Sequence, residues 1–125
     1  MLRALYIIVD EDIEDMVYAD PDPEELEPEL WERVTEIVQE VAEGDREAEG
    51  VDKIDDCLIS WRVLLRNGLS FIAITEDVGA NLVDKYLRNL QRQYFDEVDD
   101  VRRPEKEGVA DVVVDVIPPW EEDDE

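Results

Sequence analysis

Pairs of neighbouring carboxylates are the side chains of this sequence best suited to chemistry, and they occur at 10–12, 55–56 and 99–100. Carboxylate oxygens can hold Mg²⁺ or Ca²⁺, and two carboxylates of different pKa can act as general acid and base. The run Asp10-Glu11-Asp12 lacks the spaced ligands, the turn glycine and the closing glutamate of a calcium loop. Because 37 residues are acidic, adjacent pairs arise by chance. We predict solvated surface carboxylates; a weak cation site and a small carboxylate-dependent enzyme are the alternatives.

Nucleophilic and phosphate chemistry has little to build on. Histidine is absent, so the single cysteine, Cys57, has no imidazole to activate it, and its apolar neighbours predict a buried, inert thiol. The hydroxyl groups outside tyrosine belong to Thr35, Ser60, Ser70 and Thr75, none of them in a nucleophile-elbow context. Gly68 and Gly79 are isolated, unlike the glycines of a phosphate-binding loop. We therefore expect no catalytic residue, no cofactor, no metal site and no enzymatic activity.

The charge balance excludes several kinds of partner. With 37 acidic and 12 basic residues, the 125-residue chain carries a formal charge of −25, which repels nucleic-acid phosphates and anionic lipids. Apolar residues make up 44% of the chain and recur in periodic segments, so we expect a folded domain rather than a disordered chain. Self-repulsion of this size destabilises a compact state at low ionic strength. The hypothesis is an acidic surface adapted to a salt-rich cytoplasm.

The sequence predicts a cytoplasmic location. One cysteine cannot form an intramolecular disulfide, which favours a reducing compartment. No segment approaches the roughly 20 apolar residues that span a bilayer, and residues 1–4 do not begin like a signal peptide. We expect no stable membrane insertion and no nucleic-acid partner.

The first half of the chain predicts two strands and a helix. Residues 2–9 are almost continuously apolar, which is typical of a strand covered on both faces, and 16–19 form a short strand expected to pair with it. A helix begins with Pro28 at its first position and stops at Gly44. A solvated loop is predicted for 44–50. The helix has an apolar stripe of Leu26, Leu30, Val34, Ile37, Val38 and Val41.

The second half predicts three strands and a helix. A short strand over 51–56 precedes a strand over 57–65, in which one face is wholly apolar and includes Trp61, a core residue. Arg66-Asn67-Gly68 favours a tight hairpin turn, after which 69–75 return as an apolar strand. Asp77 is expected to cap the next helix. That helix has a stripe of Val78, Leu82, Val83, Tyr86, Leu87, Leu90 and Tyr94, with Asp84 and Arg88 paired outside it.

The C-terminal segment is ambiguous. Valines spaced through 109–117 fit a helix, whereas three consecutive valines favour a strand; we favour the helix. Pro118 and Pro119 end the segment, and 121–125 form an acidic tail that we expect to be disordered. The fold class is α+β: a single domain over 1–120 with about five mainly antiparallel strands and helices on both faces of the sheet.

The stretch from Leu58 to Asp77, with the following helix that closes on Tyr94-Phe95, resembles the longin-like (SNARE-like) superfamily. Residues 2–9 also resemble the first strand of that superfamily, whose members include longin domains, small chains of clathrin adaptors and subunits of vesicle-tethering complexes. The resemblance implies a longin- or profilin-like sheet and a last element that is a clear helix. It also implies a non-enzymatic module that binds other proteins, often small GTPases, and often forms dimers.

Two places are predicted as contact surfaces. One is an exposed edge strand, and the other is a groove beside the first helix near Leu30, Trp31 and Val34. Trp120 is a further candidate, because tryptophan is enriched at interface hot spots, although packing onto the domain is an equal alternative. The function expected is a scaffold or regulatory subunit that forms a homodimer. The alternative from another class is an acidic mimic of nucleic acid that inhibits a basic protein.

Overall fold

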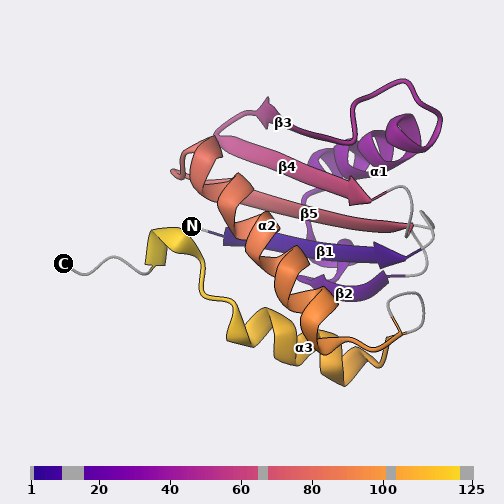
Figure 1. Cartoon of the computed structure of the whole chain (residues 1–125). Helices are drawn as coiled ribbons and strands as arrows, with labels where there is room; N and C mark the ends of the chain where they lie inside the picture. The colour runs from indigo at the N-terminus through magenta and orange to yellow at the C-terminus, as the bar shows by residue number, and fades with distance from the viewer. Residues whose placement is uncertain (1, 10–15, 65–67, 101–103, 122–125) are drawn as a thin grey trace.

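The structure, a computed structural model, describes residues 2–9, 16–64, 68–100 and 104–121. Within them lie five strands and three α-helices (Figure 1). The strands are β1 (Leu2–Val9), β2 (Met16–Asp20), β3 (Glu49–Ile54), β4 (Cys57–Leu64) and β5 (Leu69–Glu76). The helices are α1 (Pro28–Ala42), α2 (Ala80–Glu97) and α3 (Lys106–Asp115), with 3₁₀ turns at Pro23–Glu25 and Pro119–Glu121.

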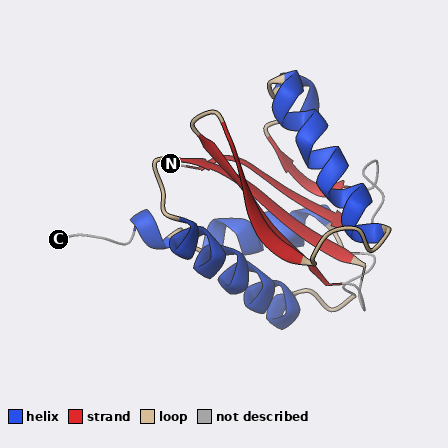
Figure 2. Cartoon of the chain, turned by 90° about the horizontal axis from the view of Figure 1, so that it is seen from above, coloured by secondary structure: helices blue, strands red, loops and turns tan. Residues whose placement is uncertain are grey.

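The strands form one antiparallel sheet in the order β2-β1-β5-β4-β3. The first and the last strands in the chain, β1 and β5, are therefore neighbours at the centre, and β2 and β3 form the two edges. Helix α1 covers one face of the sheet, and α2 and α3 cover the other, as the view from above shows (Figure 2). The predicted α+β architecture with helices on both faces is confirmed.

Central strands that are apolar on both faces make this three-layer arrangement necessary. In β1, Ala4, Tyr6 and Ile8 enter the core beneath α1, while Leu5, Ile7 and Val9 enter the core beneath α2 and α3. Strand β5 alternates in the same way, with Ile72 and Ile74 on the α1 side. A sheet with one solvated face would leave half of these side chains in water, so helices pack on both sides.

Helix α1 begins and ends where its sequence signals predict. Pro28 is its first residue, where a missing N–H costs no helical hydrogen bond. At the other end Gly44 has φ +83°, its N–H donates to the carbonyl of Val41 at 3.1 Å, and the N–H of Asp45 donates to Glu40 at 2.8 Å. This pair of bonds is a Schellman motif, which requires a left-handed residue and therefore favours glycine.

Helix α2 begins later than predicted. Gly79 is its N-cap and no side chain caps it, while Asp77 has φ +57° in the turn after β5. The prediction that Asp77 caps the helix is wrong, because its left-handed backbone turns the chain before the helix starts. Leu82 belongs to the predicted stripe but is 39% exposed. The Asp84–Arg88 pair forms as predicted, with 3.1 Å between Oδ2 and Nε.

The valine-rich C-terminal segment is a helix, as favoured. Val109, Val112 and Val116 are buried against the α2 side of the sheet, whereas Val114 is 78% and Ile117 57% exposed. Ile117, the last residue of the segment predicted as helical, is thus on the surface, beyond the end of the helix at Asp115.

The other boundaries shift slightly. Strand β3 begins at Glu49, inside the predicted loop 44–50, and β4 is described as far as Leu64. Gly68 has the positive φ, +69°, that the predicted Asn-Gly hairpin turn needs at its second central residue. The rest of that turn, the acidic run at 10–12 and the tail from 122 lie outside the described residues.

Candidate functional site

The outer side of β3 is an unpaired sheet edge. No other described strand pairs with it. The N–H of Val63 donates to the carbonyl of Ala48 at 2.7 Å, and hydrogen bonding in an antiparallel pair alternates along the strand. Gly50 and Asp52 therefore bond to β4, and the backbone N–H and C=O groups of Glu49, Val51 and Lys53 point outward. Such a row of donors and acceptors is a template for a further strand.

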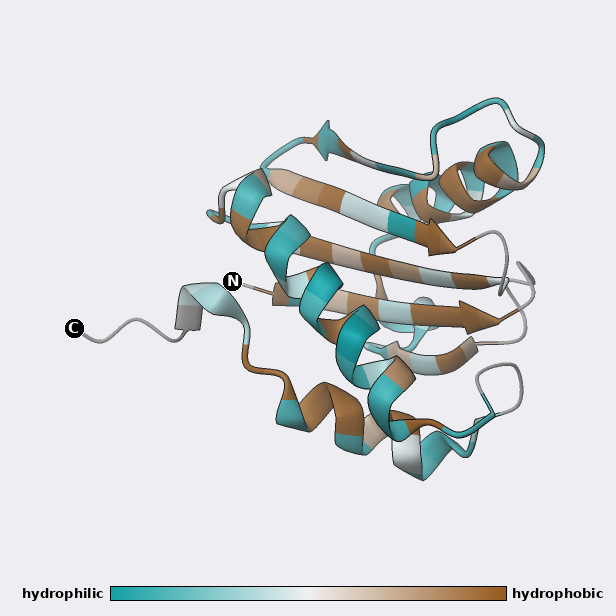
Figure 3. Cartoon of the chain, viewed as in Figure 1, coloured by the Kyte–Doolittle hydropathy of each residue, from teal (hydrophilic) through white to brown (hydrophobic). Residues whose placement is uncertain are grey.

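Side chains on the same alternation give this edge two different faces. Glu49, Val51 and Lys53 lie opposite Arg62, Ser60 and Leu58 on the α2 side of the sheet. Val51 is 43% exposed. Figure 3 shows β3 as a mainly hydrophilic strand at the edge of the sheet, whereas the central strands β5 and β1 are more apolar. The edge thus has an exposed apolar residue between an acidic one and a basic one.

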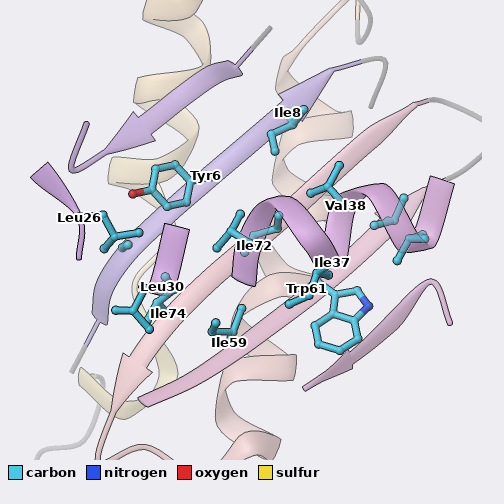
Figure 4. Packing of buried hydrophobic residues seen from close by; sticks show 14 of the residues in the cluster. Tyr6, Ile8, Leu26, Leu30, Ile37, Val38, Ile59, Trp61, Ile72 and Ile74 are labelled. Atoms are coloured by element: carbon cyan, nitrogen blue, oxygen red, sulfur yellow. The ribbon is translucent and has the colours of Figure 1, made fainter. Parts of the chain in front are cut away.

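Gly50 and Trp61 hold β3 in place on the opposite face. The two residues are register partners, and a Cβ at Gly50 would lie 2.7 Å from Cζ2 of Trp61. The indole therefore lies over the glycine backbone, and its Nε1 donates to the carbonyl of Glu47 at 2.9 Å. Trp61 is buried, as predicted, at the end of the core next to β3 (Figure 4).

Arg46 completes this attachment. Its guanidinium lies 5.2 Å from the centre of the Trp61 ring, and it pairs with Glu40 at 2.5 Å and with Asp52 at 3.0 Å. The hydrogen bond to Glu40 is the main cause that raises the pKa of Arg46 above its usual value. Arg46 thus ties the end of α1, the following loop and β3 together. Sequence reasoning missed this role, because an arginine in an acidic loop has the pattern of a solvated charge.

A cavity of about 260 Å³ lies beside the edge, between β3, β4 and the first turns of α2. It is lined by Glu49, Gly50, Val51, Ser60, Trp61, Ala80, Asn81, Asp84 and Leu87. The hydroxyl of Ser60 is buried and has no hydrogen-bond partner among the described residues. Nearby, Arg62 donates through Nε to Gln91 at 2.6 Å and through Nη1 to Glu49 at 2.8 Å. The cavity offers room and polar groups next to the outward-facing backbone.

The four residues predicted for an interface are not brought together. Leu30, which Figure 4 labels, and Val34 are both buried in the core beneath α1. They therefore line no surface groove, and that part of the prediction is corrected. Trp31 is half-buried, and its ring meets that of Tyr6 edge to face at 5.3 Å. Trp120 packs on Tyr86 with ring centres 5.3 Å apart. Of the two alternatives for Trp120, a contact residue or packing onto the domain, the structure shows the packing.

Cys57, the single thiol of the chain, lies beside a group of ion pairs. Cys57 is buried, and Nη1 of Arg3 lies 3.6 Å from its Sγ. The same guanidinium pairs with Glu27 at 2.8 Å and with Glu76 at 3.0 Å. In the part of the chain that the structure describes, no group of three or more acidic or cysteine side chains could hold a metal ion.

Comparisons with known proteins leave the site to be judged on its geometry. No protein-family model matches the chain, and no curated protein matches it. None of the described helices is both long enough and apolar enough to span a bilayer.

Proposed function

We propose that this chain is a non-enzymatic, longin-like protein-interaction module that binds its partner by strand addition at β3. The observation that carries the proposal is the row of outward backbone groups at Glu49, Val51 and Lys53, flanked by an exposed valine and a cavity. The Trp61–Gly50 contact and the Arg46 ion pairs hold this strand in one position. A preorganised edge binds a strand at a lower entropic cost than a mobile one.

The longin-like assignment is supported by the last element. The resemblance requires a helix after α2, and α3 is one. Helices on both faces of the five-stranded sheet are also what the resemblance implies. A small GTPase and a second copy of the chain are the partner classes that it suggests. The proposed setting is a salt-rich cytoplasm, in which the acidic surface is screened.

Photo-crosslinking tests where partners bind. A photo-crosslinking residue replaces Val51 in one variant and Val114, an exposed valine on α3, in the other. In native extract at about 2 M KCl, where charges are screened beyond a few ångström, the first variant is expected to give protein adducts and the second is not. Equal adducts at both positions would contradict binding at β3. A partner captured at low salt and lost at high salt would instead indicate the nucleic-acid mimic.

A proline at position 51 separates edge pairing from folding. The N–H of Val51 points away from β4, so Val51→Pro removes a donor from the outer edge and leaves the β3–β4 hydrogen bonds in place. We expect Val51→Pro to lose the adducts formed through a crosslinker at Lys53, while its circular dichroism is unchanged. Val51→Thr keeps both the N–H and the branched shape, so it is the matched control and should retain them.

A further inference from the structure

From the alternation and charges of β3 we infer that its occupant is a second copy of this chain, paired antiparallel about a twofold axis at Val51. In this arrangement Glu49 lies opposite the partner's Lys53, and Lys53 opposite the partner's Glu49. The inference rests on the proposed function, since it names the strand that is added. The two sheets would join into a single sheet through the β3 edges.

Hydrogen bonding limits the registers that two copies can adopt. Outward groups belong to Glu49, Val51 and Lys53, and in an antiparallel pair an outward residue must face an outward residue. Every register that places an odd-numbered residue opposite an even-numbered one is therefore excluded. In every remaining register the twofold axis passes through a residue of β3, and the registers differ only in which residue that is.

Charge and overlap select among these registers. An axis at Val51 pairs all residues from 49 to 53 and brings Glu49 against Lys53 on both sides of the axis. An axis at Asp52 would place two aspartates directly opposite each other, which destabilises a sheet. An axis at Lys53 would do the same with two lysines, and an axis at Gly50 would leave only 49–51 of β3 paired within the strand.

The side chains on the α2 face fit this register. Val51 is 43% exposed in the single chain and would meet its symmetry mate, which removes an exposed apolar residue from water. Glu49 and Asp84 both line the cavity beside the edge, so the partner's Lys53 would approach an acidic rim. Arg62 already engages Oε2 of Glu49 at 2.8 Å, and the added lysine would extend that pair into a short network.

A charge-swap experiment tests the register. At about 2 M KCl, sedimentation equilibrium of the full chain is expected to show a dimer in the micromolar range. Glu49→Lys and Lys53→Glu each turn two attractive pairs into two repulsive ones. These exposed charges are screened at about 2 M KCl, so the variants and their mixture are compared with wild type at about 0.15 M KCl, where each single variant should weaken the dimer about tenfold or more. Mixed together, the two variants form two attractive pairs again. We expect the mixture to give a heterodimer as tight as the wild-type dimer.

Several results would overturn the inference: a wild-type monomer throughout the micromolar range, single variants that dimerise like wild type, or a mixture that stays monomeric. If Glu49→Lys does not fold by circular dichroism, a disulfide test replaces the swap. In the inferred register the two Val51 Cα atoms lie about 5.5 Å apart, within disulfide reach. Val51→Cys should then oxidise to a covalent dimer and Val114→Cys should not; equal oxidation of both overturns the register.

The crosslinking result distinguishes this failure from that of the proposed function. A chain that stays monomeric, yet gives Val51 adducts with a different protein, overturns the second copy as the occupant and leaves strand addition at β3 standing. A monomer without adducts at Val51 overturns both.

Discussion

Tyr6 places a phenol in the centre of the sheet, where its hydroxyl has no hydrogen-bond partner among the described residues. Its ring is fully buried and packs edge to face on Trp31. Burial is the main cause that raises the pKa of Tyr6 from 10 to about 12, and the nearby Asp20 and Asp22 add to it. A buried, unsatisfied hydroxyl costs stability that a phenylalanine would not lose.

We expect Tyr6→Phe to raise the free energy of unfolding at neutral pH by about 1 kcal/mol. The folded chain holds the phenol proton more tightly than the unfolded chain. The contribution of the neutral phenol is therefore fully present below pH 10 and is lost as the pH rises through the folded pKa of about 12. Between pH 10 and about pH 12, the free energy of unfolding of Tyr6→Phe should fall less steeply with pH than that of wild type, by about 1 kcal/mol per pH unit. Urea unfolding measured from neutral to alkaline pH checks both effects.

Tyr18→Phe is the matched control. Tyr18 is half-buried, and burial is the main cause that raises its pKa. The charge of Asp20 and its hydrogen bond with the Tyr18 hydroxyl raise the pKa further. Because that substitution removes a satisfied hydroxyl, it should not stabilise the chain. A gain at Tyr18 as large as at Tyr6 would contradict the account of the unpartnered phenol.

Individual residues were predictable where their pattern is local. The alternation of Trp61 with aliphatic residues along one strand predicts it as a core residue. No local pattern predicts the role of Arg46, because its partners Glu40, Asp52 and Trp61 come from three separate elements. Leu30 and Val34 were identified as apolar, but their pattern alone could not tell the core from a groove.

Strand β3 is positioned by a contact that only glycine permits. We expect Gly50→Ala to destabilise the chain by about 1–3 kcal/mol, because its Cβ would overlap the Trp61 ring and push it off the strand. Thermal unfolding should report the loss, and the near-ultraviolet circular dichroism of the tryptophan should change with it.

Gly108→Ala is the control for this effect. Gly108 lies in α3 and a Cβ there meets nothing within 4 Å. Alanine in a helix is favoured over glycine by roughly 0.5–1 kcal/mol, so this variant should be slightly more stable than wild type. If Gly50→Ala behaves in the same way, the contact with Trp61 does not fix β3.

The periodicity of the sequence predicts the type of each element, but it does not always predict where the element begins or ends. Alternation predicted β4 and the stripe predicted α2, because both patterns extend over many residues. The predicted start of α2 is wrong because aspartate is a residue type that favours the N-cap, whereas the backbone of Asp77 is left-handed and lies before the helix. Strand β3 began inside a predicted loop because its pairing with β4, rather than its own polar sequence, makes it a strand.

For the whole molecule, the dominant force besides burial is self-repulsion of a chain with a formal charge of −25. We expect the melting temperature to rise between dilute buffer and about 2 M KCl, because the screening length falls to a few ångström. Sucrose strengthens burial without screening charge and should raise it less. An unchanged melting temperature in KCl would contradict a salt-adapted surface.

The candidate site could be predicted only as a class. An exposed edge strand was expected from the sequence, but which strand forms the edge depends on pairing between distant segments. The order β2-β1-β5-β4-β3 is set by the long-range register of β1 with β5, and no local pattern encodes it. The identity of the edge, and with it the charge pattern that it presents, required the structure.

The central place of β1 has a consequence for the way this chain acquires its shape. On one side β1 pairs with β2, which follows closely, but on the other it pairs with β5, with Leu2 opposite Thr75. As the polypeptide is synthesised, the hairpin of β1 and β2 is complete at Asp20, but the other side of β1 stays uncovered until synthesis has passed Glu76, the last residue of β5. Closure of the sheet is then a late step with a large loop entropy.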